Sequence, residues 1–199
     1  SLTEIHEDIL VEGRLDLSGC TSLRKLNKNI TVKGDLNLNG CTTLLQVQEN
    51  ITVKGDLNLS GCASLLEIDN NLTVNGSLNL SNCSRLTKTP RNLTVKGNTL
   101  NLSGCTNLTE ISESNIRTDS ILLENCSNLS IIREGLRFNY HLELEGCSSL
   151  RELPEWMFSL IRDTSSRGLM MTIRARNTGI PVRLIAEYNR RQNLPNYIG

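Results

Sequence analysis

Apolar and polar residues alternate over short segments that recur at a fixed interval along the chain. Each segment follows the pattern L-x-L-x-x-C-x-x-L, in which the last leucine-type residue lies three positions after a cysteine. Successive cysteines are 21 residues apart, except for one step of 22 residues between Cys83 and Cys105. The seven cysteines that mark the copies are Cys20, Cys41, Cys62, Cys83, Cys105, Cys126 and Cys147. Strict alternation over a few residues predicts a short β-strand with one buried face in every copy.

The apolar positions keep constant offsets from each cysteine. The residues five and three positions before it are Leu15/Leu17, Leu36/Leu38, Leu57/Leu59, Leu78/Leu80, Leu100/Leu102, Ile121/Leu123 and Leu142/Leu144. A further apolar column lies six positions after the cysteine, and Thr89 interrupts it. One short strand cannot bury its leucines alone, so the copies are expected to stack as a solenoid with a parallel sheet. Seven strands about 4.8 Å apart would make a sheet of roughly 34 Å.

The repeated motif resembles the leucine-rich repeat family in its cysteine-bearing form, over about residues 11–153. That resemblance implies an α/β leucine-rich repeat solenoid with a curved parallel β-sheet on its concave side. Residues 63–74, which return the chain to the next strand, have little helical character, so we expect a mostly irregular or 3₁₀ convex side. The family is a binding scaffold put to many uses, so the resemblance specifies fold more than activity.

The expected organisation is one domain over residues 1–199. Residues 11–153 form the seven regular repeats, and residues 154–199 form an irregular last repeat and a helical cap. A helix is predicted from Pro154, with Trp156 in the core. A strand is predicted within residues 169–180, with Ile173 and Ala175 pointing inward, and a final helix is predicted over residues 180–193. If Ile173 and Ala175 continue the strand columns, Arg174 lies beside Glu143 and Arg176 lies beside Glu145.

The cysteines are expected to be structural. Zinc ligands occur at close spacings such as C-x-x-C, whereas these cysteines occur once per repeat. Each should point inward and bond weakly to loop backbone, the role that Asn has in other leucine-rich repeats. Their odd number and shared row favour seven reduced thiols and therefore an intracellular reducing compartment. Asn58, Asn79 and Asn101 begin N-x-[ST] sequences on the expected concave face, where glycans would crowd, which argues against a eukaryotic secretory route.

Composition narrows the classes of partner. Lys plus Arg and Asp plus Glu number 21 each, so the formal net charge is zero. We therefore expect no nucleic-acid or membrane partner, because such binders usually carry excess positive charge. No run of consecutive apolar residues approaches the length needed to span a membrane. There is no Gly-rich phosphate loop and no clustered metal-ligand motif, and His141 should point away from Cys147, so the chain is expected to be no enzyme and to need no metal or cofactor.

The residue between the two strand leucines should point outward on the concave face. The early repeats carry Asp or Asn there, whereas the late repeats diverge. Irregular residues on a regular background are typical of a binding site. The predicted protein-binding residues are Leu122, Glu124, Tyr140, His141, Glu143, Glu145, Arg174 and Arg176.

We therefore interpret the chain as a monomeric protein-interaction scaffold. The repeat array followed by residues 180–199 is similar to the substrate-recognition region of bacterial effector ubiquitin ligases, although those repeats usually run L-P-x-x-L with Asn. That resemblance implies target recognition within a larger bacterial protein, secreted into a host cytoplasm, with any catalytic domain elsewhere. Two alternatives stay open: a structural or adhesion array with no single partner, and part of an intracellular immune receptor. Plant receptors of that class carry L-x-L-S-G-C-x-x-L, as at Leu57–Leu65.

Overall fold

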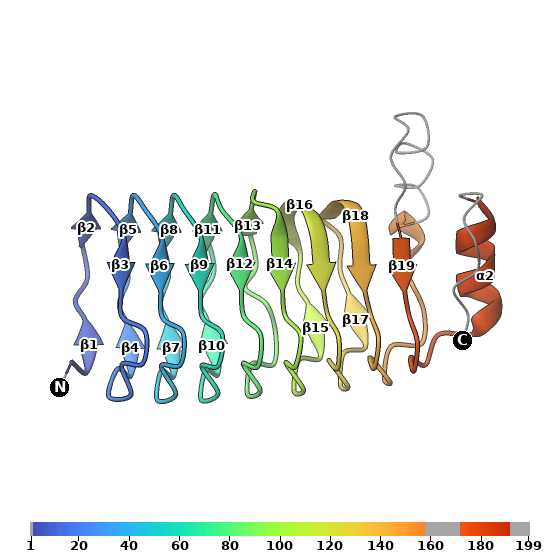
Figure 1. Cartoon of the computed structure of the whole chain (residues 1–199), viewed down its shortest axis with the longest axis horizontal. Helices are drawn as coiled ribbons and strands as arrows, with labels where there is room; N and C mark the ends of the chain where they lie inside the picture. The colour runs from blue at the N-terminus through green and yellow to red at the C-terminus, as the bar shows by residue number, and fades with distance from the viewer. Residues whose placement is uncertain (1, 158–171, 192–199) are drawn as a thin grey trace.

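The structure is a computed structural model that describes residues 2–157 and 172–191. The chain winds as a parallel β-solenoid of about seven turns, numbered here so that coil 1 ends at Cys20 and coil 7 at Cys147. Figure 1 shows the coils following one another along a straight row from the N-terminal to the C-terminal end. The predicted stacking of repeats is therefore confirmed.

Three strand-bearing sides surround the core of the solenoid, and we name each by its strands. The third face comprises β1 (Glu4–Ile5), β4 (Lys25–Leu26), β7 (Gln46–Val47), β10 (Glu67–Ile68), β15 (Glu110–Ile111) and β17 (Ile131–Ile132). The second face comprises β2 (Leu10–Val11), β5 (Thr31–Val32), β8 (Thr52–Val53), β11 (Thr73–Val74) and β13 (Leu93–Val95). The site face comprises β3 (Leu15–Asp16), β6 (Leu36–Asn37), β9 (Leu57–Asn58), β12 (Leu78–Asn79), β14 (Thr99–Asn101) and β19 (Thr172–Arg174).

Two longer strands join the second face to the site face. β16 (Ser114–Leu122) pairs with both β13 and β14, and β18 (Leu136–Glu143) pairs with β16 and β19. In coils 2 to 5 a glycine turns the chain sharply between these two faces, and a Cβ atom at Gly76 would lie 2.6 Å from the carbonyl carbon of Gly55. Coils 6 and 7 place Thr118 and Phe138 near this corner, and both are buried. Because these side chains fill the corner, the strand continues across it, with a register shift between Thr118 and Ser120.

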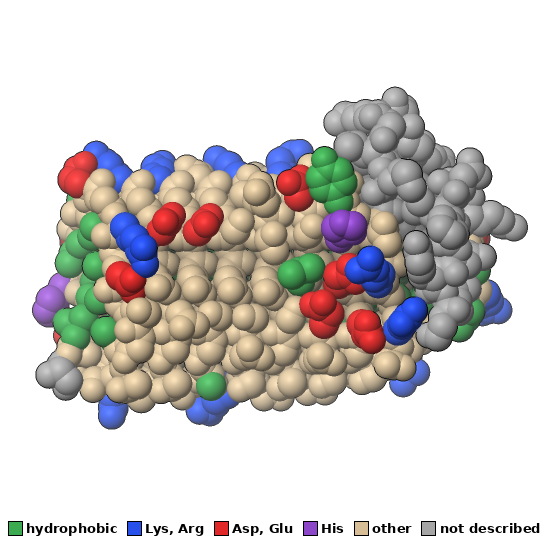
Figure 2. Space-filling view, viewed as in Figure 1, with side chains coloured by type: hydrophobic (Ala, Val, Ile, Leu, Met, Phe, Trp, Pro, Cys, Tyr) green, Lys and Arg blue, Asp and Glu red, His purple; other side chains and the backbone are tan. Residues whose placement is uncertain are grey.

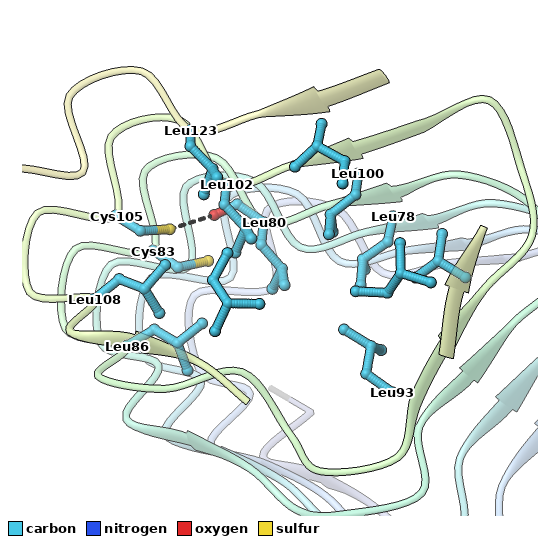
Figure 3. Packing of buried hydrophobic residues seen from close by; sticks show 14 of the residues in the cluster. Leu78, Leu80, Cys83, Leu86, Leu93, Leu100, Leu102, Cys105, Leu108 and Leu123 are labelled. Atoms are coloured by element: carbon cyan, nitrogen blue, oxygen red, sulfur yellow. Dashed lines mark hydrogen bonds between the residues drawn. The ribbon is translucent and has the colours of Figure 1, made fainter. Parts of the chain in front are cut away.

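The core is a set of stacked aliphatic columns closed by the cysteine row. Figure 3 shows Leu80, Leu102 and Leu123 stacked beside Cys83 and Cys105. Six of the cysteines are buried, and each of these thiols donates to the carbonyl oxygen of the second strand leucine of the preceding coil, at 3.0–3.2 Å. Cys105, for example, donates to Leu80 at 3.1 Å. Cys20 is half-buried because it belongs to the first coil, so the predicted inward row is confirmed with one exception.

An asparagine occupies the turn between the third face and the second face in four of the coils. Asn29, Asn50, Asn71 and Asn92 have φ between 57° and 67°, a left-handed conformation that Asn tolerates better than most residues. Their side chains also bond along the stack, as where Asn50 Nδ2 donates to Asn29 Oδ1 at 3.0 Å. These asparagines therefore have a structural role in the turn.

The return arm differs in part from the expectation. Most of its residues lie outside regular structure, as expected, but both return segments also carry strands of two or three residues in register with their neighbours, and no 3₁₀ segment occurs in the described chain. The physical reason is that the sequence N-[IL]-T-V also alternates with period two, so that Ile30 and Val32 point inward while Thr31 points outward. The described part of the molecule is accordingly a parallel β-solenoid of about seven turns with very little helix.

The C-terminal region agrees with the prediction where it is described. β19 pairs with β18, and Ile173 and Ala175 are buried as expected. Residues 155–157 are helical, with Trp156 packed partly buried against the core, and α2 (Val182–Arg191) follows β19 with Ile185 buried. The remainder of the predicted last repeat and cap, residues 158–171 and 192–199, lies outside the described residues.

Candidate functional site

Three outward rows run along the site face, each with one residue per coil. The central row is Asp16, Asn37, Asn58, Asn79, Asn101, Leu122, Glu143 and Arg174. The row before it is Arg14, Asp35, Asp56, Ser77, Thr99, Ser120, His141 and Thr172, and the row after it is Ser18, Asn39, Ser60, Ser81, Ser103, Glu124, Glu145 and Arg176. Seven of the eight predicted site residues thus lie in these rows at one end of the site face, and Tyr140 lies next to His141 on β18.

The middle of this face is neutral and uniform. Figure 2 shows a broad area of uncharged polar side chains there, with charged groups near the N-terminal end and a denser group of charged, hydrophobic and histidine side chains toward the C-terminal end. The uniform rows are held by local bonds: Asn58 Oδ1 accepts from the backbone N–H and the hydroxyl of Ser60 at 3.0 and 2.7 Å. Asn79 and Asn101 accept in the same way from the N–H groups of Ser81 and Ser103. The irregular residues therefore stand beside a rigid polar background.

Glu143 and Arg174 form the central ion pair of the irregular end. Arg174 Nη1 donates to Glu143 Oε1 at 2.8 Å, and the glutamate side chain is 10% exposed while the arginine side chain is 55% exposed. Burial raises the pKa of Glu143 above its usual value, and the nearby Glu124 adds to this; Arg174 and His141 oppose it. The predicted position of Arg174 beside Glu143 is confirmed.

A β-bulge exposes the aromatic residues of the site. Between Thr118 and Ser120 the partner strand β18 contains one extra residue, so Asn139 and Tyr140 lie opposite Asp119. Asn139 Nδ2 donates to Asp119 Oδ1 at 2.8 Å. The bulge interrupts the alternation of β18, and Tyr140 and His141 are consequently both exposed, with ring centroids 6.3 Å apart. Leu122, on the neighbouring strand, is half-buried between Asn101 and Glu143.

The flanking row contributes two carboxylates and an arginine. Glu124 accepts a short hydrogen bond from the Ser103 hydroxyl. Glu145 is exposed, and the backbone N–H of Gly146 donates to Arg176 O at 2.9 Å, so Arg176 continues this row. A side-chain pair between Arg176 and Glu145 stays a prediction.

Among residues 2–157 and 172–191, no group of three or more His, Cys, Asp or Glu side chains is placed to hold a metal ion. Burial raises the pKa of the Cys62 and Cys105 thiols to about 12, so neither is a thiolate nucleophile at neutral pH. The described helices also include none with the length and apolar character needed to cross a membrane.

One feature of the third face was not anticipated as a site. The strand order of this face is broken after β10, and a cavity of about 410 Å³ opens where Thr89 and Pro90 occupy the regular positions. The signal in the sequence was Thr89, which interrupts an otherwise apolar column. Its consequence depends on Pro90, whose effect on pairing becomes apparent only when the register between coils is known.

Comparison of the chain with protein-family models, with curated proteins and with solved structures gave no match.

Proposed function

We propose that this chain is a protein-recognition module that binds a partner through the C-terminal part of the site face. The binding residues are the eight named above: Leu122, Glu124, Tyr140, His141, Glu143, Glu145, Arg174 and Arg176. The observation that carries the proposal is their grouping on adjacent strands next to a uniform neutral surface. A half-buried leucine, an aromatic ring and charges of both signs are the mixture that anchors and orients a protein segment.

The rigidity of this surface supports the same function. Residues on a hydrogen-bonded sheet lose little conformational freedom on binding, so more of the contact energy remains as affinity. The Glu143–Arg174 pair holds one arginine in place at 2.8 Å from the carboxylate. Tyr140 is held by the bulge in β18, and not by a loose loop.

The wider role follows from the resemblance to leucine-rich repeat effectors. We propose target recognition within a larger bacterial protein that acts in a reducing compartment, including a host cytoplasm. The half-buried Leu184 and buried Ile185 of α2 pack against the core, which supports a role for this helix in covering the last coil. No catalytic role is proposed for the chain itself.

The alternative is a structural array without a single partner. It is favoured by coils 2 and 3, which carry nearly the same residues in all outward rows. The two functions differ in where substitutions matter. A structural array should depend on the repeated rows of the early coils, whereas a recognition module should depend on the late ones.

The test compares substitutions within one outward row. Immobilised wild-type chain and the variants Leu122→Asp and Asn79→Asp, together with Tyr140→Ala from the neighbouring bulge, would be used to capture proteins, which are quantified by mass spectrometry and then titrated in purified form. We expect a partner that Leu122→Asp and Tyr140→Ala lose by about tenfold or more, the size of a hot-spot loss, and that Asn79→Asp retains. A partner that is lost only with Asn79→Asp would locate recognition on the asparagine row and reject the proposed site.

A further inference from the structure

The third face is interrupted between coils 4 and 5. β1, β4, β7 and β10 form one four-stranded sheet, whereas β15 and β17 form a separate pair. In Figure 1 no strand is drawn on this side between β10 and β15. Lys88 bridges forward to Glu110, but within the described chain no hydrogen bond joins residues 66–68 to residues 87–90.

Pro90 is the cause of this interruption. In the preceding coils the equivalent backbone N–H groups belong to Asn27, Gln48 and Asp69, which donate to Ile5, Leu26 and Val47 at 3.2, 2.9 and 2.8 Å. Pro90 has no N–H to donate to Ile68, so the ladder cannot continue. One coil later, the Ser112 N–H donates to the Thr89 hydroxyl oxygen at 2.9 Å, and regular pairing returns with Arg133.

The interruption forms a slot with a defined lining. The cavity of about 410 Å³ falls within the range of roughly 300–1,000 Å³ that is usual for ligand sites. Its buried lining consists of Ile68, Thr89, Pro90 and Ser112. Val47 pairs with Ile68 of the next coil, but Ile68 has no such strand partner in the coil after it. The main chain of Ile68 therefore forms one wall of the slot.

Positive charge predominates at the rim of the slot. Lys88 and Arg91 line it together with the single carboxylate of Glu67. The nearby Glu110 is bound by Arg133 at 2.9 Å, and this pairing is the main reason that its pKa is lowered; Lys88 is farther from it at 3.8 Å and 62% exposed. Lys88 and Arg91 both help to lower the pKa of Glu110, but Arg133 makes its close hydrogen bond, and most of the Lys88 side chain remains exposed at the rim.

We propose that this slot binds the carboxyl-terminal end of an extended peptide. The peptide main chain would pair with the vacant edge at Ile68, as an added strand pairs with an open sheet edge. Its terminal carboxylate would be held by Lys88 and Arg91, and its last side chain would contact Pro90. The slot lies on a different face from the proposed protein-binding site, and the two proposals stand or fall separately.

The experiment uses acetyl-Ala-Ala-Ala with a free terminal carboxylate and the same peptide as its terminal amide. Each is titrated into the whole isotope-labelled chain, and binding is read from the shifts of backbone amide resonances. We expect shifts concentrated at residues 66–68 and 87–91, with the amide binding about tenfold more weakly, as the loss of a charge-assisted hydrogen bond implies. Equal binding of the two peptides, or no shift at these residues at millimolar concentration, would overturn the proposal.

Two variants examine the two halves of the slot. Pro90→Asn restores the N–H and the residue type of Asn27, so we expect it to close the ladder and abolish binding. Lys88→Gln combined with Arg91→Gln should reduce the preference for the carboxylate to near unity, while Lys54→Gln, an exposed lysine of the second face, should leave it unchanged. Unaltered peptide binding in either of the first two variants would show that the slot is not the site.

Discussion

Arg174 and Glu143 are 31 residues apart in the chain, yet they lie side by side on β19 and β18 with a nitrogen–oxygen distance of 2.8 Å. Their backbones are in register, because Leu142 pairs with Ile173 in the adjacent position. β19 therefore continues the columns of the seven regular repeats, although the spacing from β18 is ten residues longer than the normal 21. The ion pair lies at the point where the repeat pattern resumes.

Replacing Glu143 by glutamine should reveal the cost of burying its charge. Because the pKa of Glu143 is raised in the folded state, this state binds more protons than the unfolded one between the two pKa values, so the contribution of Glu143 to stability falls as pH rises. We expect the wild type to lose stability relative to Glu143→Gln between about pH 4 and pH 7. Urea unfolding of both proteins at the two pH values measures this difference. A relative gain for the wild type at the higher pH would mean that the Arg174 pair outweighs desolvation.

Thiol labelling should distinguish coil 1 from the rest. Cys20 is half-buried, whereas the other six cysteines are buried and bonded to carbonyl oxygens. With a thiol reagent at neutral pH, we expect one cysteine to react readily in the native protein and seven to react after denaturation. Rapid native labelling of several cysteines, located by peptide mapping, would contradict the packing of this row.

Exchange of one cysteine should cost more than exchange of a neighbouring outward residue. Cys62→Ser places a more polar hydroxyl in a packed interior, with an expected loss of about 1–3 kcal/mol. Asn58→Ser changes the outward row of the same coil and should cost less, although it removes the bonds to Ser60. Midpoints of urea unfolding for the two variants provide the comparison, and equal midpoints would not fit the observed orientations.

The stacked glycines should tolerate substitution only at the open end. A Cβ atom at Gly76 would lie 2.6 Å from the backbone of Gly55, so Gly76→Ala must separate two coils, at an expected cost of about 1–3 kcal/mol or more. A Cβ atom at Gly13 would meet nothing within 4 Å, so Gly13→Ala should change stability by less than about 0.5 kcal/mol. Thermal or urea unfolding measures both, and similar losses for the two variants would argue against close contact between the coils.

Much of this architecture could be predicted because each coil repeats the same spacing. The leucine columns and the inward cysteines follow from period-two alternation and a constant offset, and the alignment of Arg174 with Glu143 follows from matching the apolar alternation of Ile173 and Ala175 to the strand columns. The strands of the return arm could have been found by the same rule, since Ile30 and Val32 alternate with Thr31. The alternation there covers only three or four residues per coil, which is too short to distinguish a strand from an irregular segment within one repeat.

The features that escaped prediction depend on contacts between coils. Thr118 and Phe138 fill the corner between two faces, where the other coils have a glycine. This arrangement could be predicted only from the residues that pack against them in neighbouring coils. The bulge that exposes Tyr140 arises from one unpaired residue in β18 relative to β16. The break at Pro90 becomes apparent only when its missing N–H is matched to Ile68 one coil earlier. The sequence pattern of one repeat, considered alone, contains no information on these contacts between coils.

Coils 2 and 3 are nearly identical, so one of them could be removed or duplicated without changing the cross-section of the solenoid. Removing residues 42–62 would join Cys41 to Ala63 and leave every column continuous, while the N-terminal end would approach the late coils by one strand spacing, about 4.8 Å. Gain or loss of such a unit by recombination would change the reach between the two ends in fixed steps. The distance between the two ends of the solenoid therefore depends on the number of coils, and residues at either end can change without altering the coils between them.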